Sequence, residues 1–252
     1  MAEIQAHTAD EANATGTLPE RIFNRIRRAI VEGEIPAGTK ISEPELAKRF
    51  GISRAPLREA IGRLEACKLV VRRPNVGARV ASLTLTGLLE LYDLRDVLEG
   101  LAARLAAERM TSDEIADLRK LLVQHQGLSE LQEGIAYFQK EGDLDFHYRI
   151  VQGSHNSRLI ALLCNDLYHL VRMYRYQFGM PGARANKAFS EHEHIADAIE
   201  HRDAELAELL MRRHIRAARA NVETQLHATD PGIARTIEID TVRSPAITDD
   251  NE

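Results

Sequence analysis

The sequence contains no tryptophan, and aromatic residues amount to only 5% of its 252 residues. Alanine, leucine, glutamate and arginine, which are good helix formers, are frequent instead. Hydrophobic residues (44%) and charged residues (28%) are at levels ordinary for globular proteins, which excludes a disordered chain over most of the length. The composition therefore predicts a largely helical protein of one large domain or two modest ones.

Long apolar runs are also missing, since no stretch approaches the roughly 20 residues that a membrane span requires. The first residues, MAEIQAHTADEANATG, lack the basic start and apolar stretch of a signal peptide. We therefore expect a cytoplasmic protein with no membrane partner. Only two cysteines occur, Cys67 and Cys164, and the absence of a Cys-x-x-Cys pair argues against a disulfide framework or a thiolate metal site.

Charge is distributed unevenly along the chain, although the net charge is only −5. Residues 18–80 contain 14 Lys and Arg against 7 Asp and Glu, a net charge of +7. Residues 81–252 contain 19 against 28, a net charge of −9. A compact basic module followed by a larger acidic one is typical of a polyanion-binding domain joined to a domain that does not touch the polyanion. Charge alone leaves open a chance fluctuation of the surface.

The basic segment carries the pattern of three helices followed by a hairpin. Apolar residues at four-residue spacing predict a first helix around Ile22, Ile26 and Ile30. A short second helix follows, and a third begins after Ser53. LVVRR and ARVAS then flank a Pro-Asn-Val-Gly turn, which predicts two paired strands. This order predicts a winged helix-turn-helix over residues 18–82.

The exposed side of the third helix carries the residues that we expect to contact DNA. With its apolar residues buried, Ser53, Arg54, Arg58 and the stem of Arg63 remain on the surface, and the helix N-terminus is free to face phosphates or base edges. Arginine there can bind the two acceptors of guanine. The alternative is that these arginines are solvated surface charges, with Arg58 paired to a glutamate of its own helix. The complete order of helices and hairpin favours nucleic acid.

The segment ISEPELAKRFGISRAPLREAIGRLEACKLVVRRPNVGARV resembles the DNA-binding domain of GntR-type bacterial transcription regulators. The resemblance implies a homodimer that binds a short palindromic operator in double-stranded DNA, with the recognition helix in the major groove and the wing in the adjacent minor groove. Lys68 stands where the family usually has a helix-ending glycine, which predicts a left-handed lysine or a different cap. The expected DNA-contacting residues are Ser53, Arg54, Arg58, Arg63, Arg72, Arg73, Asn75 and Gly77.

The acidic segment, residues 83–227, shows only long amphipathic helical patterns. The first helix is marked by leucines from Leu91 to Leu105, and the second follows a cap at Ser112. Four more are predicted at about 131–151, 156–178, 186–201 and 203–226. Together they predict an antiparallel six-helix bundle whose interior can hold a ligand. Residues 1–17 and 228–252 are polar and irregular, which predicts a disordered tail at the start and a flexible acidic tail at the end.

Four polar residues fall on apolar helix faces of this segment. Asp143 and His147 are four residues apart on one predicted face, and His192 and His214 lie on apolar rows of two later helices. One carboxylate and three imidazoles that face inward can converge on one divalent cation. His194 is about 200° around the helix from His192 and is expected to face away. The alternative is that each histidine is a hydrogen-bonded core residue.

Four motifs resemble the ligand-binding FCD domain of the FadR-like branch of the same superfamily. They are D-L-D-F-H, G-S-H-N, E-H-E-H-I and M-R-R-H-I. In metal-containing members, an aspartate and three histidines from these motifs bind a divalent ion. The resemblance therefore implies Asp143, His147, His192 and His214 as ligands, the same four that the helix faces select. A set of nitrogen and oxygen donors suits zinc best here, with nickel and manganese as alternatives.

The same resemblance implies a small organic acid as the effector. Arg95 lies on an apolar row of the first long helix and can point inward to bind a carboxylate, helped by Arg172 or Arg175 and by Asn156 of the G-S-H-N motif. A pair between Arg95 and Glu99, four residues later, is equally compatible with the spacing.

The leading hypothesis is a DNA-binding transcription regulator whose operator affinity is controlled by a small organic acid bound near a divalent metal. One alternative is a metal sensor, in which the ion itself is the signal. Another is a metal-dependent hydrolase, because open zinc positions can activate water. H-E-x-x-H, Gly-x-Ser-x-Gly and a Gly-rich phosphate loop are absent, which counts against an enzyme, and we predict no catalytic residue.

Overall fold

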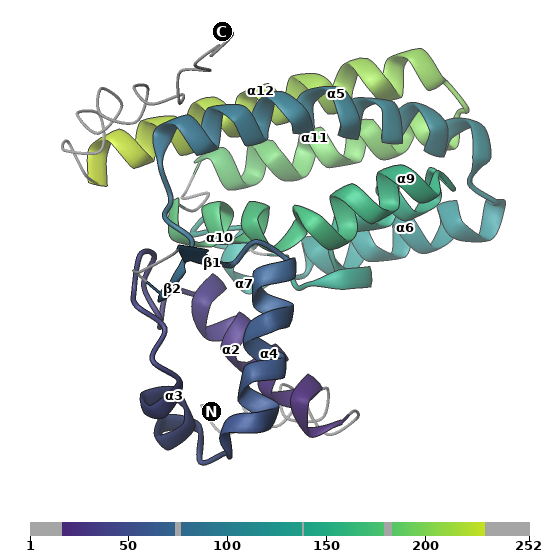
Figure 1. The fold of residues 1–252 in the computed structure, drawn as a ribbon. Helices are drawn as coiled ribbons and strands as arrows, with labels where there is room; N and C mark the ends of the chain where they lie inside the picture. Colours follow the sequence, from purple (N-terminus) through teal and green to yellow (C-terminus); the bar gives the residue numbers. More distant parts are fainter. Residues whose placement is uncertain (1–16, 74–76, 138, 179–182, 230–252) are drawn as a thin grey trace, which may run out of the picture.

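The computed structural model describes residues 17–73, 77–137, 139–178 and 183–229. These residues form a small helical part with a hairpin below a larger part of long helices (Figure 1). The small part contains α2 (Leu18–Val31), α3 (Glu43–Phe50), α4 (Arg54–Ala66), β1 (Val70–Arg73) and β2 (Gly77–Val80). The order confirms the predicted winged helix-turn-helix.

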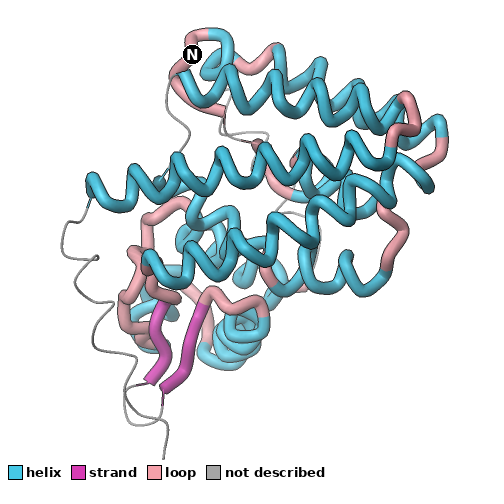
Figure 2. Tube along the Cα trace, turned by 90° about the horizontal axis from the view of Figure 1, so that it is seen from above, coloured by secondary structure: helices cyan, strands magenta, loops and turns pink. Residues whose placement is uncertain are grey.

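Apolar side chains hold the small part together in the way the spacing predicts. The helices α2 and α4 pack against each other, and this buries Ile26 of α2 together with Leu57 and Leu64 of α4 completely. The two strands pair antiparallel, with Val70 opposite Val80 (Figure 2). Lys68, just after α4, has φ of 61°, so the left-handed lysine is confirmed. This framework leaves the other face of α4 exposed.

The larger part is helical throughout its described residues. Its elements are α5 (Leu85–Arg109), α6 (Ser112–Gln126), α7 (Ser129–Gln132), the 3₁₀ turn η1 (Gly142–Leu144), α8 (Phe146–Gly153), α9 (Ser157–Ile160), the π-helical η2 (Ala161–Asp166), α10 (Tyr168–Phe178), α11 (Ala183–Glu200) and α12 (Ala204–Thr229). The helices α5 and α12 pack side by side along their lengths, and α11 lies against both (Figures 1 and 2). A helical C-terminal part is thus confirmed.

Two of the predicted helices are wrong in detail. The expected helix over 131–151 is instead α7, an irregular stretch, η1 and α8, because Gly134 and Gly142 adopt φ of 67° and 65°, which a continuing helix does not allow. The expected helix over 156–178 is divided by η2. The second long helix is capped by Thr111, whose side chain accepts from the Glu114 amide, and not by Ser112.

The two parts meet along α10, which packs against α2. The Tyr174 hydroxyl of α10 bonds the backbone of Thr84 at the start of α5, and Gln177 reaches the carbonyl of Ile30 at the end of α2. Most of the predicted tails lie outside the described residues. Within the described residues, no helix is long and apolar enough to span a membrane.

Candidate metal centre and DNA-contacting surface

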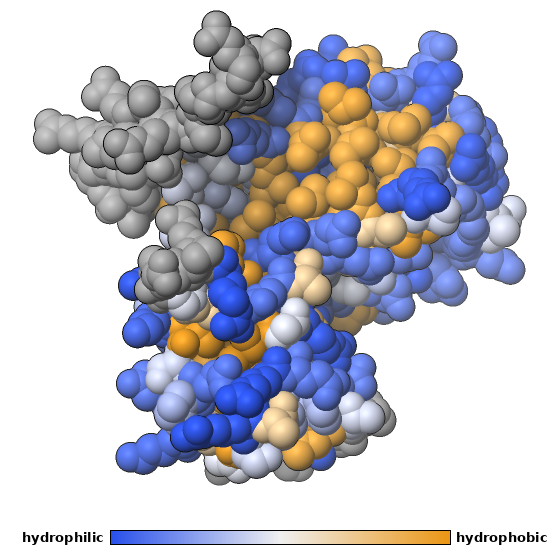
Figure 3. Space-filling model, viewed as in Figure 1, coloured by the Kyte–Doolittle hydropathy of each residue, from blue (hydrophilic) through white to orange (hydrophobic). Residues whose placement is uncertain are grey.

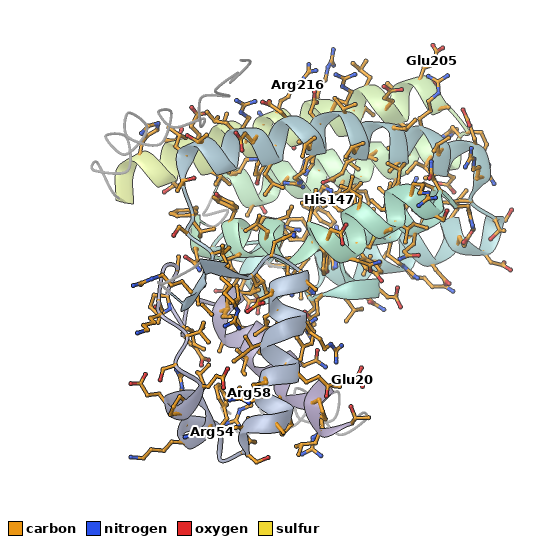
Figure 4. The ribbon with its side chains drawn as sticks, viewed as in Figure 1. Glu20, Arg54, Arg58, His147, Glu205 and Arg216 are labelled. Carbon is orange, nitrogen blue, oxygen red and sulfur yellow. The ribbon has the colours of Figure 1, made fainter. Side chains whose placement is uncertain are left out.

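Three buried histidines from three helices meet inside the larger part. His147 lies on α8, His192 on α11 and His214 on α12, and each side chain is at least nine-tenths buried. The Nε2 atom of His214 lies 3.2 Å from Nε2 of His192 and 3.2 Å from Nε2 of His147. In Figure 4, His147 sits among the helices, whereas Arg216 and Glu205 point away from them. The structure thus brings together His147, His192 and His214, three of the four predicted metal ligands.

Each of the three imidazole rings makes a polar contact through Nδ1, the nitrogen that does not face the other two rings. The Nδ1 contacts are His147 with Glu99 (2.7 Å), His214 with Glu191 (2.7 Å) and His192 with the Tyr137 hydroxyl (3.1 Å). A carboxylate accepts a hydrogen bond from Nδ1–H, which leaves the lone pair on Nε2. These partners therefore fix ring orientation and direct Nε2 atoms toward a common point.

The donor set fits a divalent cation. Nitrogen ligands about 2.0–2.1 Å from a tetrahedral zinc ion lie about 3.3–3.4 Å from each other, close to the two 3.2 Å separations measured here. Lone pairs of neutral imidazoles that face one another at this distance repel unless a proton or a cation lies between them. Three converging Nε2 atoms with held Nδ1 atoms are therefore arranged as metal ligands.

Burial keeps His192 and His214 in the neutral form that binds metals. It lowers the pKa of His192 well below the usual histidine value, and the neighbouring His214 lowers it further. Burial also lowers the pKa of His214 to about 4, although the hydrogen bond with Glu191 raises it in part. Both rings are thus uncharged at neutral pH and can donate a lone pair.

The two carboxylates that contact the Nδ1 atoms, those of Glu99 and Glu191, stay ionised because charged and hydrogen-bonding neighbours outweigh the effect of burial. Burial raises the pKa of Glu99, but the charge of Arg95 and the hydrogen bonds from Arg95 and His147 outweigh it and hold this pKa well below the usual range. Burial likewise raises the pKa of Glu191, yet hydrogen bonds from its histidine partner and from Arg184 bring it to about 2. Ionised carboxylates stabilise Nδ1–H donors and raise the basicity of the coordinating nitrogens.

Asp143 does not join the histidine cluster. It lies in η1 and is exposed, because α8 begins only at Phe146, so the predicted placement of Asp143 and His147 on one helix face is wrong. The fully buried carboxylate is Asp145, the N-cap of α8. Its Oδ1 accepts from the amide of His147, and its Oδ2 accepts from Arg175 at 3.0 Å.

A small cavity adjoins the histidine cluster. Its lining includes Arg95, Glu99, Asp145, His147, Cys164 and Arg175. The solvent-accessible volume is about 20 Å³, room for about one or two water molecules. One wall is the π-helical η2, an irregularity that is common at functional sites. The cavity is therefore next to the candidate metal and too small for an organic acid without movement of its walls.

Arg95 makes the predicted pair with Glu99 and keeps one donor unpaired among the described residues. It is buried, and its Nε donates to Glu99 at 2.6 Å, which is the predicted i, i+4 pair. Its Nη1 is also buried and has no hydrogen-bond partner among the described residues. An unsatisfied buried guanidinium N–H beside the cavity is a strong donor for an incoming anion.

Two of the predicted effector residues lie elsewhere. Arg172 is buried on another side of α10, where its Nη1 donates to Glu141 at 2.6 Å. Asn156 caps α9, and its side-chain oxygen accepts from the amides of Arg158 and Leu159. Neither side chain lines the cavity. Arg95 and Arg175 remain as the candidate effector-binding arginines.

The sequence missed four residues that build the centre: Glu99 and Glu191 as ring-orienting partners, Asp145 and Tyr137. Aspartate just before an apolar helix is an N-cap signal, and this could have moved the start of α8 and pointed to Asp145. No periodic signal marks Tyr137, because it lies in irregular chain between α7 and η1. Its hydroxyl also contacts Nδ1 of His125 at 2.8 Å, so His125 is a hydrogen-bonded core residue.

His194 is exposed, as expected.

Five of the predicted DNA-contacting residues are exposed on α4 and the hairpin: Ser53, Arg54, Arg58, Arg63 and Arg72. Ser53 is the N-cap of α4, and Arg54 and Arg58 are exposed. Figure 4 shows both arginines at the lower end of the molecule. The Nε of Arg58 donates to Glu43 of α3 at 2.8 Å, so its partner is not a glutamate of its own helix.

The remaining basic residues of this surface are anchored by packing or pairing. The Arg63 guanidinium lies 4.3 Å from the ring centroid of Phe23, and Arg72 bonds Glu65. Gly77 has φ of 87°, a conformation that favours glycine at this end of the wing. Asn75 and the side chain of Arg73 lie outside the described residues.

Family models match both parts of the chain. A model described as bacterial regulatory proteins, gntR family, matches residues 18–80. A model of the FCD domain matches residues 90–217. The boundary between the two matches coincides with the end of the hairpin and the start of α5.

Regulators from several bacteria are similar over most of the chain. The HTH-type transcriptional regulator YdhC of Bacillus subtilis is 33% identical over 74% of this chain and 83% of the relative. The Nta operon transcriptional regulator of Aminobacter aminovorans is 31% identical over 71% and 81%. The repressor RspR of Escherichia coli K12 is 28% identical over 81% and 89%.

Solved structures show the same fold. Escherichia coli McbR/YncC superposes with a TM-score of 0.67 at 20% identity, covering 84% of this chain and 100% of the other. A GntR regulator from Rhodococcus sp. RHA1 superposes with a TM-score of 0.60 at 22% identity, covering 81% and 96%. The arrangement of a winged helix below a helical part is thus shared with these proteins.

Proposed function

Because the chain belongs to the gntR family of bacterial regulatory proteins and carries an FCD domain, we propose that this DNA-binding transcription regulator responds to a small organic acid held beside a divalent metal. Its relatives are transcription regulators, so the hydrolase alternative is set aside. FCD domains often bind metal, and the three converging imidazoles support zinc as the ion, with nickel or manganese as alternatives. Relatives named as repressors favour repression.

The observation that carries the proposal is the unsatisfied Nη1 of Arg95. It is buried beside a cavity that His147 also lines. A carboxylate placed there can accept from Arg95, and the bound metal would supply positive charge on the side of His147. Arg175, at the same cavity, adds a second guanidinium. Such a site selects a small anion rather than a neutral molecule.

The small volume of the cavity explains how binding could be transmitted. An acid of several heavy atoms fits only if α8, η2 or α10 moves, because these elements carry most of the lining. The lining residue Tyr168 accepts a hydrogen bond from the amide of Gly142 at 2.8 Å. The preceding residue, Glu141, binds Arg172 of α10 and Arg27 of α2, each at 2.6 Å. A shift of α10 therefore reaches the DNA-binding part directly.

A thermal-shift screen tests the proposed effector class. We expect mono-, di- and tricarboxylates of suitable size to raise the melting temperature, since a ligand at 100 times its Kd adds about 2.7 kcal/mol to stability, or several degrees for a chain of this size. Removing the metal with a chelator should abolish this response. No carboxylate response in the metal-loaded protein would contradict the proposal. A change in operator affinity caused by metal alone would instead support the metal sensor.

Changing Glu141 should separate effector binding from DNA control. In Glu141→Gln the charge between Arg27 and Arg172 is lost, so we expect the acid to bind with affinity within about twofold of the parent but to change operator affinity several-fold less. Coupling energies of this kind are about 1–3 kcal/mol. Operator affinity with and without the acid measures the effect, and Glu133→Gln, an exposed glutamate at the end of α7, is the control. Equal coupling in both variants would contradict this route.

We further propose that the protein is a homodimer joined through α5 and α12. Leu94, Val97 and Leu101 on α5 are 50%, 54% and 37% exposed, and Leu206 and Leu209 on α12 are similarly exposed. Figure 3 shows a broad hydrophobic area over this part of the molecule. GntR regulators typically act as dimers, and the two-fold symmetry of a dimer matches that of a palindromic operator. We propose that this dimer acts in the cytoplasm. Analytical ultracentrifugation that gave a monomer would contradict this interface.

A further inference from the structure

A second basic surface lies in the DNA-binding part, next to the recognition helix α4 rather than on it. It is an open groove of about 1000 Å³ between α2 and the end of α3. Four arginines line it: Arg21, Arg25 and Arg28 on α2, and Arg49 on α3. Glu34 is the acidic residue of this lining. We refer to this surface as the arginine groove.

Two of these arginines are held in place by an aromatic ring. The guanidinium carbons of Arg25 and Arg49 lie 4.8 Å and 5.5 Å from the centroid of Phe50. Stacking orients a guanidinium and leaves its N–H edge free, and that edge matches the oxygens of a phosphate. Arg49 also lies 3.6 Å from Glu34, but both side chains are about half exposed, so this pair is weak. The groove is thus preorganised for anions.

The position of the groove indicates which anion it meets. Its lining ends with Gly51 and Ile52, which directly precede Ser53 and Arg54 at the start of α4. In Figure 4, Arg54 of α4 and Glu20, in the first turn of α2, both lie toward the lower end of the molecule, away from the larger part of long helices. A duplex that receives the N-terminus of α4 in its major groove therefore brings phosphates close to the groove.

We propose that the arginine groove binds the sugar–phosphate backbone of the operator duplex beside the major groove entered by α4. The inference rests on the DNA binding of this family and adds a contact outside the recognition helix and wing. Backbone contacts fix register and affinity without reading sequence. The groove therefore contributes to operator DNA and to unrelated DNA alike, whereas Arg54 and Arg58 of α4 distinguish them.

The test is the salt dependence of DNA binding by the double variant Arg21→Gln/Arg25→Gln. Each lost phosphate contact lowers the slope of log K against log salt by about 0.9 and affinity by roughly tenfold at 0.1 M salt. We expect both operator and unrelated duplexes to lose affinity by the same factor, so that their ratio stays constant. Arg158→Gln, an exposed arginine on α9, is the matched control and should leave both slopes unchanged.

Two further variants separate charge from folding. Arg25→Lys keeps the charge and should retain the slope, and Arg21→Gln/Arg28→Gln leaves the arginines on Phe50 in place and should still lower it. An unchanged slope in both double variants would overturn the inference and point to an acidic protein partner. If Arg58→Ala still weakens operator binding in that case, DNA binding through α4 stands. Loss of the operator preference in the double variants would also overturn it, because the groove would then read bases.

Discussion

Replacing His192 with alanine should abolish stoichiometric metal binding. His192 is fully buried, and its Nε2 lies 3.2 Å from Nε2 of His214, so its removal takes one of three converging donors. Removing a residue that hydrogen-bonds to a metal ligand typically lowers metal affinity by about 10- to 100-fold. Removing the ligand itself should lower the affinity further. Elemental analysis of the purified protein measures metal per chain. We expect about one ion per chain in the parent and far less in the variant.

His194→Ala provides the matched control for this experiment. It lies two residues further along α11 and is exposed, so its removal should leave the metal content unchanged. Because His192→Ala also opens space beside Phe146, which stacks on the ring at a centroid distance of 4.2 Å, His192→Gln tests whether metal loss follows from misfolding. A folded His192→Gln protein with full metal content would overturn the centre. Equal metal loss in His194→Ala would overturn the helical register.

Stability should follow the metal in the same series. An ion that binds only the native state stabilises it by RT ln(1 + [L]/Kd), where [L] is the concentration of free ion. The parent should therefore melt at a lower temperature after chelation, and His192→Gln should show little further change. This comparison separates the energy supplied by the ion from the packing of the ring.

The sequence was sufficient for the three histidines because they lie on regular helices. His192 and His214 occupy the apolar rows of α11 and α12, where periodicity alone determines which residues face inward. The same reasoning placed His194 outside. The winged helix was predictable for a similar reason, since turns and apolar spacing agree in every element.

The prediction failed where regular structure ended. Asp143 has the correct helical spacing from His147, but Gly142 adopts a left-handed conformation and Asp145 caps α8, so the helix does not extend back to Asp143. Tyr137 reaches His192 from an irregular segment, and its position depends on tertiary packing rather than on any repeat. Local pattern therefore identifies the candidate ligands that lie on helices, whereas the contacts made by the irregular chain between helices become visible only in the structure.

Arg95 illustrates a different limit of sequence reasoning. The spacing allowed two roles for Arg95: binding the carboxylate of an effector, or pairing with Glu99. In the structure the guanidinium pairs with Glu99 through Nε, and its Nη1 is left available for a carboxylate. A guanidinium has five N–H donors, so one acceptor does not exhaust it. Glu99 in turn contacts His147, and this links the candidate effector site to the candidate metal centre.

Replacing Arg58 with alanine should weaken operator binding by about 10- to 100-fold. Arg58 is 66% exposed on α4, so it is free to reach base edges or phosphates, and one such contact contributes about 1–3 kcal/mol. The substitution should leave folding unchanged, because exposed positions alter stability by only about 0.5 kcal/mol. Fluorescence anisotropy with operator and unrelated duplexes at matched salt measures the loss, which should be larger for the operator.

Glu43→Gln gives the opposite expectation and completes the experiment. Glu43 now accepts from Arg58 at 2.8 Å, and this pair must open or turn when Arg58 binds DNA. Removing the carboxylate frees Arg58 and takes a negative charge away from the phosphates, so operator affinity should stay equal or rise. Unchanged affinity in Arg58→Ala would contradict the assignment of α4 as the recognition helix. A fall in Glu43→Gln as large as in Arg58→Ala would instead mean that the ion pair itself shapes the DNA-binding surface.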